Sequence, residues 1–183
     1  MKTTMFTLPD TVTVSGREYP VRTDFRVILE IFVMLDDPDL TDADKTEALL
    51  RMFYVNRPSD TDEALKAFSE FADPRNAGRT ASKVSSRFLD WQQDFDLMIA
   101  LIDHILGFEC RAVDYLHWRT FLSAYLEIPP ESVFARVLRI RDKLRTGKKL
   151  EKYERTWYHK NRDLVHLKPK FSQSEEAILK EWA

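Results

Sequence analysis

Apolar side chains recur at helical spacing in one segment of this chain after another, and this pattern constrains the fold more than any other feature. In residues 91–106, for example, Phe95, Ile99 and Ile102 stand three or four positions apart and so share one side of a helix. The chain has only four glycines among 183 residues, whereas folds rich in tight turns or phosphate-binding loops use more. We therefore predict a mainly α fold with about six or seven helices.

Residues that cap helices divide the chain into the expected elements. Serine, threonine and aspartate favour a helix start, because their side chains accept hydrogen bonds from free backbone N–H groups. The pair Ser172 and Glu175 predicts a further short helix in the last segment of the chain. The expected starts are Thr23 or Asp24, Thr41 with Asp44, and Ser59 or Asp60, and later helices are expected over residues 91–106, 114–126, 130–145 and 151–164.

One stretch near the N-terminus alternates apolar and polar residues instead. Val12 and Val14 precede a turn that contains Gly16, and the alternation continues beyond it. This pattern predicts a β-hairpin over about residues 10–22. Because two strands alone are marginally stable in water, the hairpin is expected to pack on helices.

These elements are expected to form a single helical domain over residues 1–165, followed by a C-terminal helical arm over residues 166–183. A hydrophobic content of 44% is enough for one complete core. The residues expected in that core include Ile28, Phe32, Trp91, Phe95, Ile99, Trp118, Phe121 and Phe134.

The sequence lacks the motifs that mark common catalytic sites. It has no Gly-x-x-x-x-Gly-Lys loop, no Gly-x-Gly-x-x-Gly fingerprint and no Gly-x-Ser-x-Gly elbow. No two histidines are four residues apart, so a zinc site on one helix has no local basis. Asp94, Asp96 and Asp103 are interpreted as a solvated helix face. We predict no catalytic residue, no cofactor and no metal, and therefore no enzyme.

The single cysteine, Cys110, excludes an intramolecular disulfide and is interpreted as a small core residue. An enzyme that uses Cys110 and His117 as nucleophile and base is the least supported alternative. The N-terminal residues lack the apolar stretch of a signal peptide, and the longest apolar runs are too short to span a bilayer. A cytoplasmic protein without membrane contact is expected.

Charge is distributed unevenly along the chain. Residues 131–170 carry thirteen lysines and arginines against five acidic residues, whereas residues 1–130 carry fourteen against twenty-two. Two oppositely charged surfaces favour self-association, so a homo-oligomer is one expected state. The basic and aromatic segment 136–155 supports an alternative function, a nucleic-acid-associated regulator. We favour a solvated helix pair or a protein-binding surface, because the remainder of the chain is acidic.

The candidate partner-binding residues come from this basic region and from the tail. The tail carries more apolar surface than a short isolated helix leaves in water, so its order requires packing on something else. Docking on another molecule is preferred to packing on the chain's own core. The candidates are Arg139, Arg141, Arg145, Trp157, Tyr158, Phe171, Ile178, Leu179 and Trp182.

Several short blocks, taken in order, resemble the bacteriophage gene-product-fifteen family. The likeness covers about residues 5 to 165, and the tail after Leu164 lies outside it. The blocks are Leu8-Pro9-Asp10, Thr23-Asp24-Phe25-Arg26, Asp90-Trp91-Gln92-Gln93-Asp94-Phe95-Asp96, Leu116-His117-Trp118-Arg119-Thr120-Phe121-Leu122, Ile128-Pro129-Pro130-Glu131-Ser132-Val133-Phe134 and Val137-Leu138-Arg139-Ile140-Arg141.

This resemblance implies a part in phage tail assembly. Proteins of this kind look like chaperones that coat the long, helical, aggregation-prone tape measure protein until tail tube subunits displace them. The resemblance therefore implies the tape measure protein and tail tube subunits as partners, the bacterial cytoplasm as location, and absence from the mature virion. The nucleic-acid-associated phage regulator remains the alternative.

Overall fold

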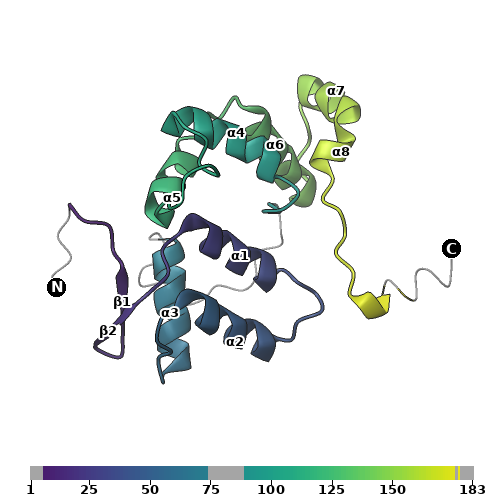
Figure 1. Cartoon of the computed structure of the whole chain (residues 1–183). Coiled ribbons are helices and arrows are strands. Elements are labelled where there is room, and N and C mark those ends of the chain that lie inside the picture. Colours follow the sequence, from purple (N-terminus) through teal and green to yellow (C-terminus); the bar gives the residue numbers. More distant parts are fainter. Residues whose placement is uncertain (1–5, 74–88, 176, 178–183) are drawn as a thin grey trace. The chain divides into compact units, whose positions relative to one another are not determined.

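The computed structural model describes residues 6–73, 89–175 and 177 of the chain. Within them the protein is mainly helical and has one N-terminal two-stranded sheet, which confirms the predicted fold class (Figure 1). Contacts group the chain into two compact units. Unit 1 holds residues 1–84, 114–121 and 170–183, and unit 2 holds residues 85–113 and 122–169. The domain boundary expected near residue 165 stays a prediction.

The hairpin of unit 1 consists of strands β1 (Thr11–Val14) and β2 (Arg17–Pro20), which pair in antiparallel register. Ser15 and Gly16 join them with φ angles of 47° and 78°. Positive φ at both central residues is what a type I′ turn requires, and this turn matches the twist of the strands. The strand β1 packs on α3, so the hairpin leans on a helix as expected.

The first helices begin where their capping residues predict. Helix α1 (Phe25–Leu35) is capped by Asp24, α2 (Asp42–Phe53) by a capping box of Thr41 with Asp44, and α3 (Thr61–Ala72) by Asp60. Helices α1 and α2 lie side by side, and α3 contacts α2 (Figure 1).

Aromatic rings fill the core of unit 1. Phe25 and Phe121 stack with their centroids 4.6 Å apart, and Phe121 also stacks on Trp118 at 5.7 Å. The indole N–H of Trp118 donates to the Ala72 carbonyl at 2.9 Å. The polar edge of this buried ring is therefore satisfied at the end of α3.

Helix α5 (Trp118–Leu126) begins four residues later than predicted. Residues before it pair with the start of α1 instead: Phe25 N–H donates to the Leu116 carbonyl, and Trp118 N–H donates to the Thr23 carbonyl. These backbone groups are used in a short bridge, so the helix begins only after it.

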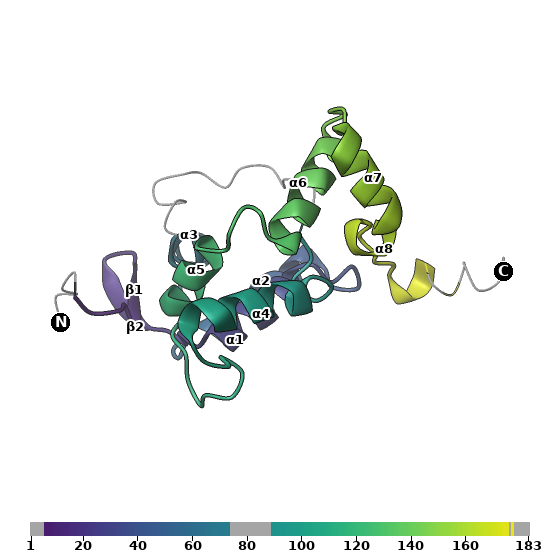
Figure 2. The same cartoon turned by 90° about the horizontal axis from the view of Figure 1, so that it is seen from above.

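Unit 2 contains α4 (Phe95–Leu106), α6 (Val133–Arg145), α7 (Lys152–Lys160) and the single turn α8 (Arg162–Val165). Figure 2 shows the chain reversing between α6 and α7, and α8 contacts both helices. Helix α4 ends at Gly107 with φ 78°, which confirms the expected stop.

Three boundaries in unit 2 differ from the predictions. Helix α4 begins at Phe95 rather than at residue 91, because the Asp90 carboxylate accepts the N–H groups of residues 92 and 93 in a turn. Helix α6 begins after Ser132, which caps it, rather than at Pro130. The helix expected over 151–164 breaks at Asn161, so α7 and α8 are separate.

Most of the predicted core is buried: Ile28, Ile99, Trp118, Phe121 and Phe134 are all under a tenth exposed. The exceptions are Phe32, Trp91 and Phe95, which are only half-buried. Phe95 shares the helix face of Met98, Ile99 and Ile102 but is the first residue of α4, and Trp91 precedes that helix, so both lie at the end of the face that these three residues bury.

The first part of the tail contacts the segment between α1 and α2. Lys170 Nζ lies 3.3 Å from Asp36 Oδ2, and Gln173 N–H donates to Asp39 at 2.8 Å. Ser172 and Glu175 exchange hydrogen bonds as the predicted capping box. The candidate residues Ile178, Leu179 and Trp182 lie outside the described residues. No helix in the described ranges combines the length and the apolar character needed to cross a bilayer.

Candidate partner-binding surface

One of the predicted surface cations lies inside unit 2. The Arg141 guanidinium forms two bonds with the Asp94 carboxylate, of 2.6 and 2.9 Å, and donates to the carbonyls of Leu164 and Val165. The structure thus uses Arg141 to hold the α8 segment against α6. The interpretation of Asp94 as part of a solvated face is wrong, because only 1% of the residue is exposed.

A second buried carboxylate joins α6 and α7. Glu154 is fully buried, and Lys143 Nζ lies 2.7 and 2.8 Å from its two oxygens. Glu154 also accepts the Glu151 N–H at the start of α7. Burial by itself would raise the pKa of Glu154, but the Lys143 and Glu151 hydrogen bonds, with the charges of Lys143 and Arg139, hold that pKa below its usual value.

Two other arginines of α6, Arg139 and Arg145, remain at the surface. Arg139 is partly exposed, with its Nε 3.9 Å from Glu154. Arg145 pairs with Asp142 at 2.8 Å, also at the surface. The density of cations in the sequence therefore overstates the positive charge that this helix pair presents to a partner, since Arg141 and Lys143 neutralise buried carboxylates.

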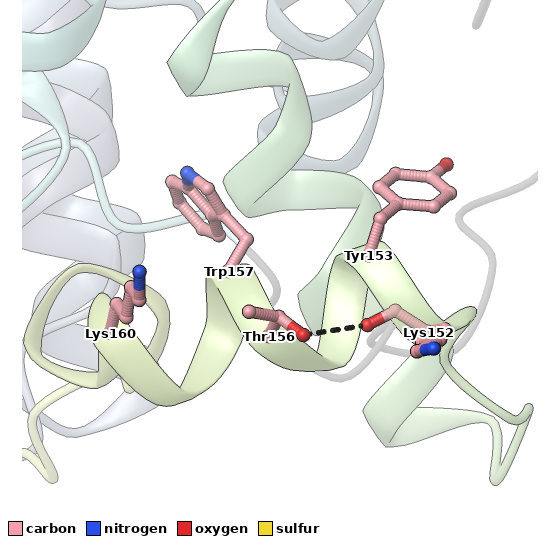
Figure 3. Close-up of a pocket in the computed structure, with 5 residues that line it drawn as sticks. All are labelled: Lys152, Tyr153, Thr156, Trp157 and Lys160. Carbon is pink, nitrogen blue, oxygen red and sulfur yellow. Dashed lines mark hydrogen bonds between the residues drawn. The ribbon is translucent and has the colours of Figure 1, made fainter.

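The exposed side of α7 carries a groove of about 580 Å³ lined mainly by apolar surface. Five residues of that one helix line it, and Figure 3 shows the rings of Tyr153 and Trp157 rising from the same side. They are four residues apart and so are neighbours on the helix surface. The lining residues are Lys152, Tyr153, Thr156, Trp157 and Lys160.

Two contacts fix the shape of the groove. The Arg136 guanidinium of α6 lies 5.4 Å from the Trp157 ring centroid, in cation–π range. The Thr156 hydroxyl donates to the Lys152 carbonyl at 3.0 Å, so it is directed along the helix. Tyr153 has no such cover and is 64% exposed. Tyrosine and tryptophan are among the residue types enriched at protein interfaces.

The structure places the remaining candidates elsewhere. The Tyr158 hydroxyl lies 2.8 Å from His166 Nε2, and Arg162 lies over the Tyr158 ring, so Tyr158 faces α8 rather than the groove. Phe171 is exposed in the tail. Of the predicted residues that the structure describes, only Trp157 lines the groove.

Sequence reasoning missed Lys152, Tyr153, Thr156 and Lys160 as partner-binding residues. The signal was available, because Tyr153 and Trp157 are one turn apart on a helix that is otherwise polar.

Cys110 is fully buried, which confirms its interpretation as a core residue. Its sulfur and the carboxylates of Asp103 and Glu109 lie within 4.8 Å of one another. Burial, reinforced by Asp103, raises the pKa of the Cys110 thiol to about 12. A protonated thiol is a poor nucleophile and a poor metal ligand. Both ring nitrogens of His117 have backbone partners, the Pro9 carbonyl and the Arg119 N–H.

The described fold and surface define a mainly helical protein with an N-terminal hairpin and an exposed aromatic groove. The family model described as Bacteriophage Gp15 protein matches residues 6–167. The chain therefore belongs to the bacteriophage Gp15 family, which confirms the resemblance carried by its sequence blocks. No curated protein and no solved structure matches the chain.

Proposed function

We propose that this phage protein is a non-enzymatic tail assembly chaperone that binds the tape measure protein. In this role it acts in the bacterial host cytoplasm, is displaced by tail tube subunits and is absent from the finished virion. The observation that carries the proposal is the aromatic groove on α7, in a chain that belongs to the Gp15 family.

A groove of this kind suits a long helical client. Such a client presents apolar helix faces that aggregate unless another protein covers them. Tyr153 and Trp157 offer a large apolar contact area, and aromatic rings lose little conformational entropy on binding because they have only two side-chain torsions. Binding of this type needs no catalytic group.

The groove favours this function over a nucleic-acid-associated regulator. A nucleic-acid site needs cations that track phosphates, together with rings that are open for base stacking. On α6, Arg141 and Lys143 are bound to buried carboxylates. The Trp157 ring already carries the Arg136 guanidinium.

Co-expression tests the proposal. The tape measure protein of the same phage is produced alone, with the full chain, and with an unrelated small helical protein. We expect it to be insoluble alone and with the unrelated protein, and to elute with the full chain as a soluble complex in size-exclusion chromatography. Equal insolubility in all three cultures would contradict the proposal.

A further inference from the structure

The residues of the α7 groove form a stripe with a defined length. Tyr153 and Trp157 occupy its centre, and Lys152 and Lys160 are eight residues apart at its two ends. Eight residues of helix span about 12 Å along the axis. Along the helix axis the two aromatic residues thus lie between two lysines whose positions are about two turns apart.

The charged residues that line the stripe have one sign. None of the five lining residues is acidic, and Glu154, the acidic residue between Tyr153 and Thr156, is buried with Lys143 on the side of α6. Arg136 adds a further cation beside Trp157. A partner that fits this surface is therefore apolar at its centre and negative at its ends.

We infer that the α7 stripe binds an amphipathic helix that carries two acidic residues seven or eight positions apart with apolar residues between them. The two acidic side chains pair with Lys152 and Lys160. The apolar residues, which stand three and four positions after the first acidic residue of the partner helix, pack on Tyr153 and Trp157. This inference rests on the proposed function and names the client segment that the chaperone recognises.

The mainly apolar lining supports a helix rather than a nucleic acid as the occupant. Phosphates contact cations in water, whereas an apolar groove gains free energy when apolar side chains displace its water. The two lysines then set the orientation and specificity of the partner, since charges at the rim of an interface contribute more to specificity than to affinity.

Two fluorescein-labelled helical peptides test the inference against the full chain. Both carry leucines at the central positions, and they differ only at the two flanking positions, which are glutamates in one peptide and lysines in the other. Fluorescence anisotropy should give a dissociation constant about tenfold lower for the glutamate peptide, because two attractions become two repulsions. Equal affinities would overturn the inference.

Charge reversal in the protein is the complementary experiment. The double variant Lys152→Glu/Lys160→Glu should prefer the lysine peptide, whereas the control Lys148→Glu/Lys149→Glu, at exposed positions outside the groove, should keep the original preference. Unchanged preferences in the reversed variant would refute the pairing.

Tyr153→Ala should weaken the binding of both peptides about tenfold. Phe108→Ala, which replaces an exposed aromatic residue outside the groove, should weaken the binding of neither. Displacement of the glutamate peptide by a single-stranded oligonucleotide would show a nucleic-acid site instead.

The same variants separate this inference from the proposed function. If the full chain and its Tyr153→Ala variant keep the tape measure protein equally soluble, the α7 stripe is not the client site but the chaperone function stands. If the full chain leaves the tape measure protein insoluble while the peptides bind as expected, the stripe binds a helix of another protein and the proposed function fails.

Discussion

Arg141 and Asp94 form a buried two-bond ion pair, although 47 residues separate them in the sequence. Their side chains are 5% and 2% exposed. The remaining donors of the guanidinium reach the carbonyls of Leu164 and Val165. One arginine on α6 therefore joins the residue before α4 and the end of α8 within unit 2.

Replacement of Arg141 should strongly destabilise the protein. Arg141→Met keeps much of the side-chain volume but leaves the buried Asp94 carboxylate without its cation, which costs about 3–5 kcal/mol in comparable buried pairs. Urea denaturation measures the loss. The control Arg145→Ala removes the surface pair with Asp142 and should cost less than about 1 kcal/mol. Similar small losses in both variants would show that the Arg141 pair has no special structural role.

Phe121 and Phe95 should differ in their contributions to stability. Phe121 is fully buried between Phe25 and Trp118, so Phe121→Ala should cost about 3–5 kcal/mol. Phe95 is half-buried at the start of α4, and Phe95→Ala should cost roughly half as much. Chemical denaturation of both variants checks the order. A loss under about 1 kcal/mol for Phe121→Ala would remove Phe121 from the core.

The features predicted correctly depend on neighbouring residues in the chain. Asp24, Thr41 and Asp60 bind backbone N–H groups two or three residues away, and the turn at Ser15 and Gly16 closes a hairpin of adjacent strands. Such signals lie within a few positions of one another, so a single sequence carries them.

Two of the features predicted wrongly depend on distant residues. The start of α5 is set by hydrogen bonds between Trp118 and Thr23, and the burial of Asp94 is set by Arg141. Neither partner can be read from local spacing. The same limit applies to the binding surface: a cation count does not show that Arg141 and Lys143 face buried carboxylates.

Stability should fall in acid through Glu154. Its pKa in the folded chain lies below the ordinary value of 4.5, so its contribution is complete above that pH and is lost as the pH falls through the folded pKa. Glu154→Gln should be less stable at pH 7, and its melting temperature should approach that of the unmodified protein as the pH drops below about 4. Thermal unfolding between pH 7 and pH 2 measures both curves. The control Glu131→Gln, at an exposed position, should show the same dependence of melting temperature on pH as the unmodified protein. A curve for Glu154→Gln that stays parallel to that of the unmodified protein would contradict the prediction.

Deletion of residues 171–183 should leave the body of the protein folded. The hydrogen bond from Gln173 N–H to Asp39 is at the surface, and the ring of Phe171 is exposed. Surface contacts of this kind contribute little, so the melting temperature should change by no more than about 3 °C.

If the tail docks on another molecule, as the sequence predicts, the deletion should instead lower the oligomeric mass or the binding of the tape measure protein, measured by light scattering and co-purification. Asp39→Ala in the full chain is the matched control, because it removes the Gln173 acceptor and keeps the tail. A deletion that unfolds the body without any change in assembly would show that the tail is part of the core.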